Sequence, residues 1–342
     1  MTRTSLAGPA LTRRTLLGGL GGMAAGGLLT GCARRLGGGV MTSVDTHPDG
    51  YPTVEAVRYF GQLLEQRSIG RLRLRIYAGG QLGNERDTLE ITTFGGLDFN
   101  RVNLAPLNSI EPLTVVAALP FIFRDTAHMR AVVDGPIGDE ILASLEPHGL
   151  IGLCFYDSGS RSFYNTRGPI TRPEDMRGLK LRVPGSDLYI DMIRALGADA
   201  VPMPLDEVYQ SLAQGVIDGA ENNWPSFESG RHFEVARYYS LTGHLLTPEA
   251  FVMSKVSWDA LGPDDRRLVK QAARDSVPRM RQLWDAQVEK SRAAVLAGGV
   301  QVNDVDTAPF AQAMTAMWDD ALVTDRQRAL VDRILAVGGN QP

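Results

Sequence analysis

One stretch of seven residues, Leu150–Tyr156, constrains the fold most because it is almost continuously apolar. A short apolar run of this kind is typical of a strand that is buried on both faces of a sheet. Further strand patterns at 71–77, 97–103 and 179–183 alternate with helical patterns, such as the one that places Val57, Phe60 and Leu64 on one face. This repeated order of helix and strand predicts an α/β fold with a central sheet.

The second half of the chain adds a long helical pattern at 263–297 with Pro278 inside it, and the proline predicts a kink. A helix is predicted at 206–215 and a short strand at 216–220, and a capping box at Thr324 and Gln327 predicts the start of the last helix. A length of 342 residues favours about two domains. With 44% hydrophobic and 22% charged residues, the chain has enough apolar material for a sizeable core.

The first 31 residues have the pattern of an export signal. Arg13 and Arg14 precede an apolar, glycine-rich run that ends in Leu-Thr-Gly and Cys32. The paired arginines resemble a twin-arginine signal, and the run before Cys32 resembles a lipobox, in which that cysteine is lipidated and becomes the first mature residue. A buried helix is disfavoured because six of the ten positions 18–27 are glycine, each costing about 1 kcal/mol against alanine. We therefore predict an export signal at 1–31, a linker at 32–39, and a lipid anchor on Cys32.

Composition argues against several classes of function. The net charge is −4 and no block of lysine or arginine is present, so we expect no nucleic-acid partner. Cys32 and Cys154 cannot form a disulfide framework, and Cys154 is expected to be inert packing within the apolar run. The five histidines never have the i, i+4 spacing of a helical metal site, and each alone is expected to be structural or at the surface. We expect no metal, no cofactor and no catalytic residues.

Three local sequences, at 158–163, 178–184 and 215–224, stand at strand ends, where α/β proteins gather ligand groups. They contain Arg161, Arg182 and Asn222. Two arginines with an amide suit a carboxylate, because a guanidinium donates two parallel hydrogen bonds to it. For each arginine alone, a solvated strand face or an ion pair is the commoner role, so these residues by themselves do not decide between that role and ligand binding.

Several motifs in the same order resemble the solute-binding proteins of TRAP transporters, the DctP-like family, from about Val40 to the end of the chain. The matching segments are residues 80–86, 118–123, 176–184, 206–212 and 216–222, and residues 254–255 with Trp258. In that family the arginine that matches Arg182 makes the main salt bridge to the substrate carboxylate. The resemblance implies that Arg161 and Asn222 complete this clamp.

The resemblance also implies a two-lobed, periplasmic-binding-protein-like α/β fold, with a ligand cleft between lobes that crossing strands connect. The helix at 263–297 is the candidate for a long helix shared by both lobes. The boundaries that we expect are 40–158 plus 248–287 for lobe I and 159–247 plus 288–342 for lobe II. A lipobox is less usual in this family, and here the chain departs from the family pattern.

The function implied is that of a periplasmic receptor, which captures a small organic acid and delivers it to a membrane permease with a small and a large subunit. Residues 81–86, 101–103 and 241–249 look most like those of sugar-acid binders, which points to a uronate or an aldonate. Candidate partners for the sugar hydroxyls are Glu85, Arg86, Asn103 and His47, although each also fits a helix cap or a loop hydrogen bond.

Three other functions stay open at this point. The first is a receptor for a C4-dicarboxylate. The second is an exported enzyme on a similar fold, which requires an acid–base pair or a metal cluster in the cleft. The third is a lipid-anchored sensor subunit that passes ligand occupancy to a signalling partner.

Overall fold

The structure is a computed structural model that describes residues 39–338. The predicted export signal with Arg13 and Arg14, the lipobox cysteine Cys32 and all of the predicted linker except its last residue lie outside the described residues. The predicted α/β class is confirmed, because the chain forms two sheets with helices packed around them. No helix within residues 39–338 is long and apolar enough to span a bilayer.

The first sheet has five strands in the order β2-β1-β3-β10-β4, and we call the part of the chain built on it lobe I. Its strands are β1 (Val40–Val44), β2 (Arg73–Tyr77), β3 (Phe99–Asn103), β4 (Leu150–Tyr156) and β10 (Glu249–Ser254). The apolar run therefore forms a strand, as predicted. Strand β10 pairs antiparallel with β3 on one side and β4 on the other, although nearly 100 residues separate β4 from β10 in the sequence.

The second sheet has six strands in the order β11-β9-β5-β8-β6-β7, and we call the part of the chain built on it lobe II. Its strands are β5 (Arg161–Asn165), β6 (Lys180–Val183), β7 (Asp199–Pro202), β8 (Gly219–Asn222), β9 (Tyr238–Leu245) and β11 (Gln301–Asp304). The strand predicted at 216–220 is shifted, because Val216 is half exposed and pairing begins only at Gly219. A Cβ at Gly219 would lie 2.3 Å from the Tyr164 carbonyl oxygen, so β5 and β8 approach this closely only with glycine there.

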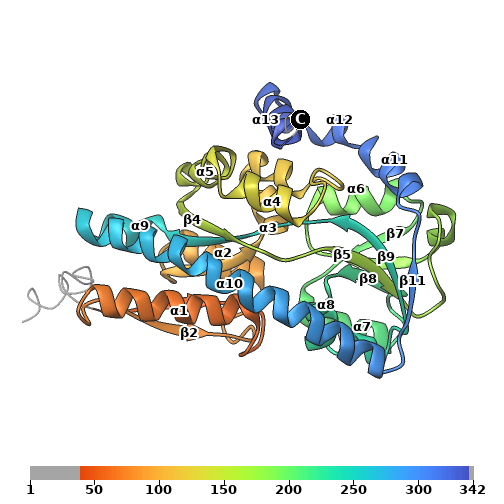
Figure 1. Ribbon diagram of the computed structural model, residues 1–342, viewed down its shortest axis with the longest axis horizontal. Helices are drawn as coiled ribbons and strands as arrows, with labels where there is room; N and C mark the ends of the chain where they lie inside the picture. Colours follow the sequence, from red (N-terminus) through yellow and green to blue (C-terminus); the bar gives the residue numbers. More distant parts are fainter. Residues whose placement is uncertain (1–38, 339–342) are drawn as a thin grey trace, which may run out of the picture. The chain divides into compact units, whose positions relative to one another are not determined.

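The chain crosses between the lobes twice from strand to strand, and one helix contacts both lobes. The chain passes from β4 into β5 and returns from β9 into β10. The predicted long helix is confirmed as α10 (Pro263–Ala297), with Pro278 inside it. Helix α10 packs against α1 (Pro52–Arg67) and β4 of lobe I and against α8 (Trp224–Ser229) of lobe II, and Figure 1 shows it running along both lobes.

The remaining helices cover the faces and ends of the sheets. In and around lobe I they are α2 (Glu85–Thr93), α3 (Leu104–Asn108), η1 (Pro112–Ala118), α4 (Thr126–Val133), α5 (Pro136–Ala143), η2 (Glu146–His148) and α9 (Lys255–Asp259). In lobe II they are η3 (Pro173–Met176), α6 (Asp187–Ala195), η4 (Leu205–Glu207), α7 (Val208–Ala213) and η5 (His232–Glu234). The helix predicted at 206–215 is thus a 3-10 turn followed by a shorter α-helix.

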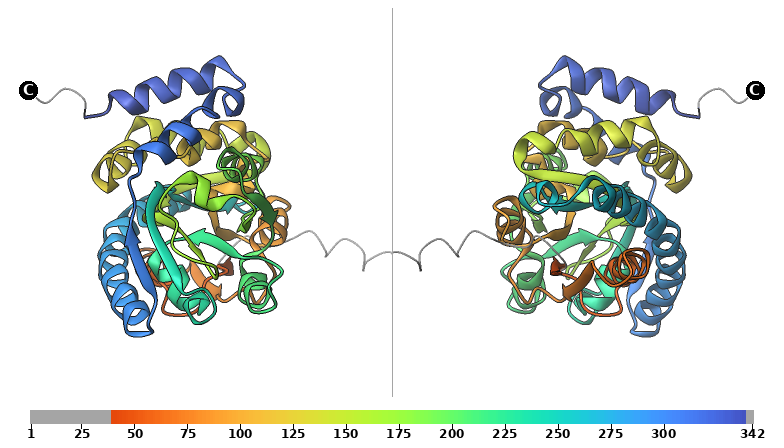
Figure 2. Two further views of the ribbon diagram at one scale, coloured as in Figure 1. Left: turned by 90° about the vertical axis from the view of Figure 1, so that its right-hand side faces the viewer. Right: turned by 90° about the vertical axis from the view of Figure 1, so that its left-hand side faces the viewer.

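The C-terminal helices are α11 (Ala308–Thr315), α12 (Trp318–Ala321) and α13 (Asp325–Ala336), and Figure 2 shows them beside the helices of residues 126–143. Thr324 and Gln327 form the predicted capping box of α13. Helix α11 contacts α6 of lobe II, whereas α13 packs against α5 and η1 of lobe I. One hydrophobic cluster draws residues from both lobes and from these helices, so the lobes share a core on this side. The exact residue boundaries of the lobes remain a prediction.

Candidate functional site

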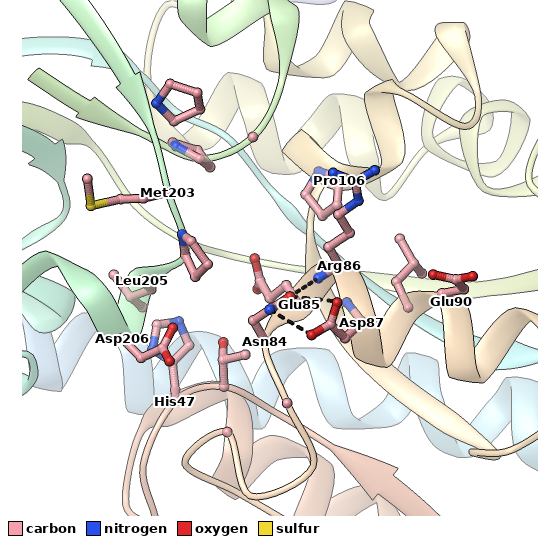
Figure 3. A pocket seen from close by; sticks show the side chains of 18 of the residues that line it. His47, Asn84, Glu85, Arg86, Asp87, Glu90, Pro106, Met203, Leu205 and Asp206 are labelled. Carbon is pink, nitrogen blue, oxygen red and sulfur yellow. Dashed lines mark hydrogen bonds between the residues drawn. The ribbon is translucent and has the colours of Figure 1, made fainter.

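A cleft of about 1180 Å³ lies between the two lobes. Lobe I lines it mainly with the loop before α2 and with α2 itself, and lobe II lines it with residues after β6 and β7. Figure 3 shows the side chains of α2 on one wall and those of Met203, Leu205 and Asp206 on the other. The carboxyl ends of the parallel strands β6 and β7 thus open into the cleft, which is where α/β sheets usually hold ligands.

Strand register brings Arg182 to this cleft. Arg182 of β6 lies beside Ala220 of β8, and Ala220 in turn lies beside Tyr164 of β5. Residues in one such row point to the same face of a sheet, so the side chains of Arg182 and Tyr164 share a face with only the small Ala220 between them. The row places a cation and a phenol hydroxyl together at the cleft end of lobe II.

The guanidinium of Arg182 is buried but has no counter-ion among the described residues. Only 5% of the residue is exposed, and its Nε donates to the Met203 carbonyl oxygen at 2.9 Å. Within residues 39–338 it forms no ion pair with a carboxylate, and burial lowers its pKa. Neither a solvated strand face nor an internal ion pair therefore describes Arg182. A buried cation without a partner is costly, and an anion that enters the cleft supplies that partner.

Arg161 is also buried, but Glu221 neutralises it. Its Nη2 donates to Glu221 Oε1 at 2.8 Å and its Nε to Oε2 at 2.5 Å, while its Nη1 donates to Asn222 Oδ1 at 2.9 Å. The Arg161 guanidinium lowers the pKa of Glu221 to about 2 although burial alone would raise it. Asn222 Oδ1 also accepts from the Asn223 backbone N–H, which leaves the Asn222 amide N–H₂ group as its free donor. Neither Arg161 nor Asn222 lines the cleft.

Lobe I holds a third buried arginine, Arg101, in the middle of three carboxylates. Its Nε donates to Asp45 Oδ2 at 3.0 Å and its Nη1 to Glu85 Oε1 at 2.8 Å. Glu249 Oε2 lies 3.2 Å from Nη1 as an ion pair, but without the geometry of a hydrogen bond. Burial, with a smaller contribution from the neighbouring Glu85 and Asp45 carboxylates, raises the pKa of Glu249 to about 7, although Arg101 acts in the opposite direction.

The predicted hydroxyl partners have different positions. Glu85, Arg86 and His47 line the cleft, whereas Asn103 does not. Asn103 Oδ1 caps α3 by accepting from the Ala105 N–H at 2.9 Å. Glu85 is held through Oε1 by Arg101, and its other oxygen has no hydrogen bond to the described residues.

His47 and Arg86 stand on the lobe I wall with contrasting surroundings. The His47 ring stacks on Tyr51 at 3.8 Å between centroids, and burial together with Arg101 lowers the pKa of His47 to about 3. The imidazole is therefore neutral at physiological pH. Arg86 is exposed and has no ion pair within residues 39–338, and its side chain points toward Pro106 (Figure 3).

Sequence reasoning missed several residues of this site. Arg101 and Glu249 belong to segments that resemble sugar-acid binders, but nothing in the sequence indicates that residues so far apart meet. His232 and Tyr209 also line the cleft, and His232 carries no local motif that singles it out. The structure therefore enlarges the polar lining beyond the predicted set.

The described residues offer no centre for metal chemistry. Across residues 39–338, no group of three His, Cys, Asp or Glu side chains is arranged to hold a metal ion. Cys154 is buried in β4, and burial raises the pKa of its thiol well above the usual range, as for a packed side chain rather than a nucleophile. What the cleft does offer is an unpaired buried cation facing a wall of hydrogen-bonding groups.

The chain is similar in sequence and fold to bacterial solute-binding proteins. The family model for DctP, bacterial extracellular solute-binding protein family 7, matches residues 43–325. A solute-binding protein of Chromohalobacter salexigens is 42% identical over 293 residues, which cover 83% of this chain and 87% of that protein. A TRAP periplasmic solute-binding protein of Bradyrhizobium sp. BTAi1, solved in complex with α/β-D-galacturonate, is 50% identical with a TM-score of 0.86, covering 87% of this chain and 99% of that one.

One related protein has been solved in two states. The TRAP periplasmic solute-binding protein of Citrobacter koseri with bound D-glucuronate is 38% identical and has a TM-score of 0.85. Its apo, open structure has a TM-score of 0.78, and each comparison covers 87% of this chain and 99% of the other. The lobes described here are therefore arranged more like those of the ligand-bound form.

Proposed function

The chain belongs to family 7 of the bacterial extracellular solute-binding proteins, the DctP family. We propose that it is a TRAP-type receptor for a sugar acid, with a uronate as the first candidate ligand. The observation that carries this proposal is the buried guanidinium of Arg182, which faces the cleft and has no carboxylate partner within residues 39–338. A ligand carboxylate neutralises it through the two parallel hydrogen bonds of a guanidinium. No bond of the ligand is made or broken, and binding closes the lobes.

The groups around Arg182 suit a ligand with one carboxylate and several hydroxyls. Asn222 is fixed by Arg161 so that its amide N–H₂ remains as a second donor at the same edge of the sheet. On the lobe I wall, Glu85 keeps one oxygen without a partner, and the neutral His47 ring faces the cleft. Oxygen acceptors and neutral nitrogens are suitable partners for sugar hydroxyls. Asn103, whose oxygen caps α3, offers only its amide N–H₂.

The solved relatives support a uronate in particular. The Bradyrhizobium protein contains galacturonate and the Citrobacter protein glucuronate. A curated relative from Escherichia coli, 32% identical, is named a 2,3-diketo-L-gulonate-binding periplasmic protein. A C4-dicarboxylate is the second candidate, because Arg86 supplies a further cation without an ion pair on the opposite wall.

The remaining parts of the proposal concern location and partners. The receptor works in the periplasm and passes its ligand to the small and large subunits of a membrane permease, rather than acting as an enzyme or a sensor subunit. Cys32 carries a lipid that anchors the mature chain. Mass spectrometry of the mature N-terminus tests the anchor, since an unmodified first residue at another position contradicts it.

The proposed function is tested by isothermal calorimetry and thermal unfolding with a panel of acids. D-glucuronate, D-galacturonate and D-gluconate are compared with succinate and malate, and with neutral glucose as the control. A ligand at a hundred times its Kd stabilises the protein by about 2.7 kcal/mol, which raises the unfolding midpoint by several degrees. We expect this for the uronates. Binding of succinate or malate alone would replace the sugar acid by the dicarboxylate, and binding of glucose would remove the role given to Arg182.

A further inference from the structure

His232 is a buried histidine on the lobe II wall, and the carboxylate site formed by Arg182 gives it no role so far. It opens η5, directly after Arg231, whose backbone is left-handed with φ 57°. Only 1% of the residue is exposed, yet it lines the cleft. The one hydrogen bond that its imidazole ring forms with the described residues joins Nδ1 to the Tyr164 hydroxyl at 2.7 Å.

The surroundings of Tyr164 determine which ring nitrogen of His232 carries the proton. Tyr164 and Arg182 lie in one row of the sheet. Burial raises the pKa of the Tyr164 phenol, and the Arg182 guanidinium is close enough to oppose this rise. A nearby cation attracts the lone pairs of the phenol oxygen, so the hydroxyl hydrogen points away from Arg182 and toward His232 Nδ1. An Nδ1 that accepts a hydrogen bond in a neutral ring leaves the proton on Nε2.

The ring is neutral for two reasons. Burial lowers the pKa of His232 to about 3, and the positive charge of Arg182 acts in the same direction. A neutral ring with Nε2–H is a hydrogen-bond donor that adds no charge. Because Nδ1 is held by Tyr164, the direction of that donor is fixed.

Gly230 leaves room beside this donor. A Cβ at Gly230 would lie 2.7 Å from His232 Nε2 and 3.0 Å from the Ser226 carbonyl oxygen. The backbone of Gly230 has φ −76°, so the conformation itself does not require glycine. The absence of a side chain instead keeps the space next to Nε2 free, and Gly230 also lines the cleft.

We propose that His232 Nε2 donates a hydrogen bond to an oxygen on the carbon next to the carboxylate that Arg182 holds. In a uronate this is the ring oxygen, and in an aldonate it is the adjacent hydroxyl. The inference rests on the proposed function and deepens it, because it makes His232 a specificity residue for acids oxygenated beside the carboxylate. Succinate, which has a methylene group at that place, leaves the donor unpaired, and an unpaired buried donor weakens binding.

The test compares D-glucuronate with its carbocyclic analogue, in which a methylene group replaces the ring oxygen. Wild type is expected to bind glucuronate roughly 10- to 100-fold more tightly than the analogue. His232→Phe fills the same space without a donor and is expected to lose this preference, binding both ligands about as wild type binds the analogue. Gly230→Ala, which crowds Nε2, is expected to weaken glucuronate in the same way.

Two further variants complete the comparison. Tyr164→Phe releases the proton of His232 to either nitrogen and is expected to reduce the preference in part. Tyr156→Phe is the control, because that hydroxyl is bonded to Ser276 in lobe I at 2.7 Å and does not line the cleft. It is expected to leave both affinities unchanged.

Nitrogen-15 NMR of the histidine side chains measures the protonation and chemical shift of Nε2. A histidine that only packs would show no change in this signal when ligand binds. The signal of His232, identified by its absence in His232→Gln, is expected to show a protonated Nε2 that shifts when glucuronate binds. An unchanged Nε2 signal, or a His232→Phe variant that keeps the preference for glucuronate, overturns the inference while the proposed function stands. Failure of wild type to bind any uronate overturns both.

Discussion

Lobe I buries Arg101 behind the cleft-lining Glu85, lobe II buries Arg182 at the cleft itself, and the two arginines differ in what surrounds them. Arg101 of lobe I is completely buried and meets Asp45, Glu85 and Glu249. Arg182 of lobe II is nearly as buried and meets no carboxylate within residues 39–338. In that part of the chain, the one hydrogen bond of its side chain goes to the Met203 backbone carbonyl.

The difference separates a structural cation from a binding cation. Arg101 forms ion pairs with three acids of its own lobe and holds Glu85 at the cleft, so its charge is compensated when no ligand is present. The charge of Arg182 is compensated only when an anion arrives from outside. A buried ion pair that loses one partner is strongly destabilised. Removal of Arg182 leaves no carboxylate of the described residues without its cation, and only the Met203 carbonyl oxygen loses a donor.

The largest effect is expected when the two arginines are replaced in the same way. Arg101→Met leaves Asp45 and Glu249 buried without their cation, and we expect a loss of about 3–5 kcal/mol in the free energy of unfolding. Arg182→Met is the matched control and is expected to stay within about 1 kcal/mol of wild type without ligand. Urea unfolding of the ligand-free proteins measures both. Equal losses in the two variants would remove the distinction between the lobes.

Ligand affinity, unlike stability, is expected to depend strongly on Arg182. Arg182→Ala leaves the ligand carboxylate without its partner, at about 2–5 kcal/mol, or roughly 30-fold to several-thousand-fold in Kd. Arg182→Lys keeps the charge but loses the two parallel donors, so it should also bind poorly. Lys180→Ala, on the exposed end of the same strand, is the control and should change affinity by less than about 0.5 kcal/mol. Calorimetry with glucuronate that finds both Arg182 variants near wild type would contradict the carboxylate clamp.

The smallest effect concerns the proton on Glu249. Burial raises its pKa from 4.5 to about 7, so between these values the folded protein holds a proton that the unfolded chain has released. Stability from this group is therefore present at low pH and is lost as pH rises toward and through 7. Glu249→Gln removes this dependence, and relative to wild type it should gain up to about 3 kcal/mol between pH 5 and pH 8.

Urea unfolding of wild type and Glu249→Gln at several pH values measures this change. Asp45 and Glu85 face the same guanidinium and are present in both proteins, so the difference between the two curves isolates Glu249. A difference in the free energy of unfolding that stays constant from pH 5 to pH 8 would show that Glu249 is ionised throughout.

The elements that sequence patterns predicted well are those whose pattern is local. Leu150–Tyr156 and the helix at 263–297 stand where their apolar periodicity placed them, and the capping box at Thr324 needs only three further residues to form. The strand at 216–220 was misplaced because its start depends on a neighbour. Pairing begins where Gly219 can approach the backbone of β5, and this close approach is not visible in the local sequence.

The residues of the site likewise divide into those that a local pattern indicates and those that depend on distant contacts. A strand that alternates lysine, leucine and arginine points to Arg182, and the structure places that side chain at the cleft. The absence of a counter-ion for Arg182, and the three acids around Arg101, depend on residues far apart in the sequence. The Nε2–H donor of His232 depends on the hydrogen bond between its Nδ1 and Tyr164, which lies 68 residues earlier in the sequence. No local motif indicates this contact.

The position of β10 has a consequence for how the chain folds. This strand lies in the interior of the lobe I sheet between β3 and β4, yet it is made only after all of the lobe II strands except β11. Until residue 254 has left the ribosome, β3 lacks one of its two partner strands, β4 lacks the strand that joins it to the sheet, and Arg101 lacks Glu249. The lobes therefore do not mature one after the other from the N-terminus. Such long-range pairing folds slowly, and during that time open strand edges must be kept from other chains.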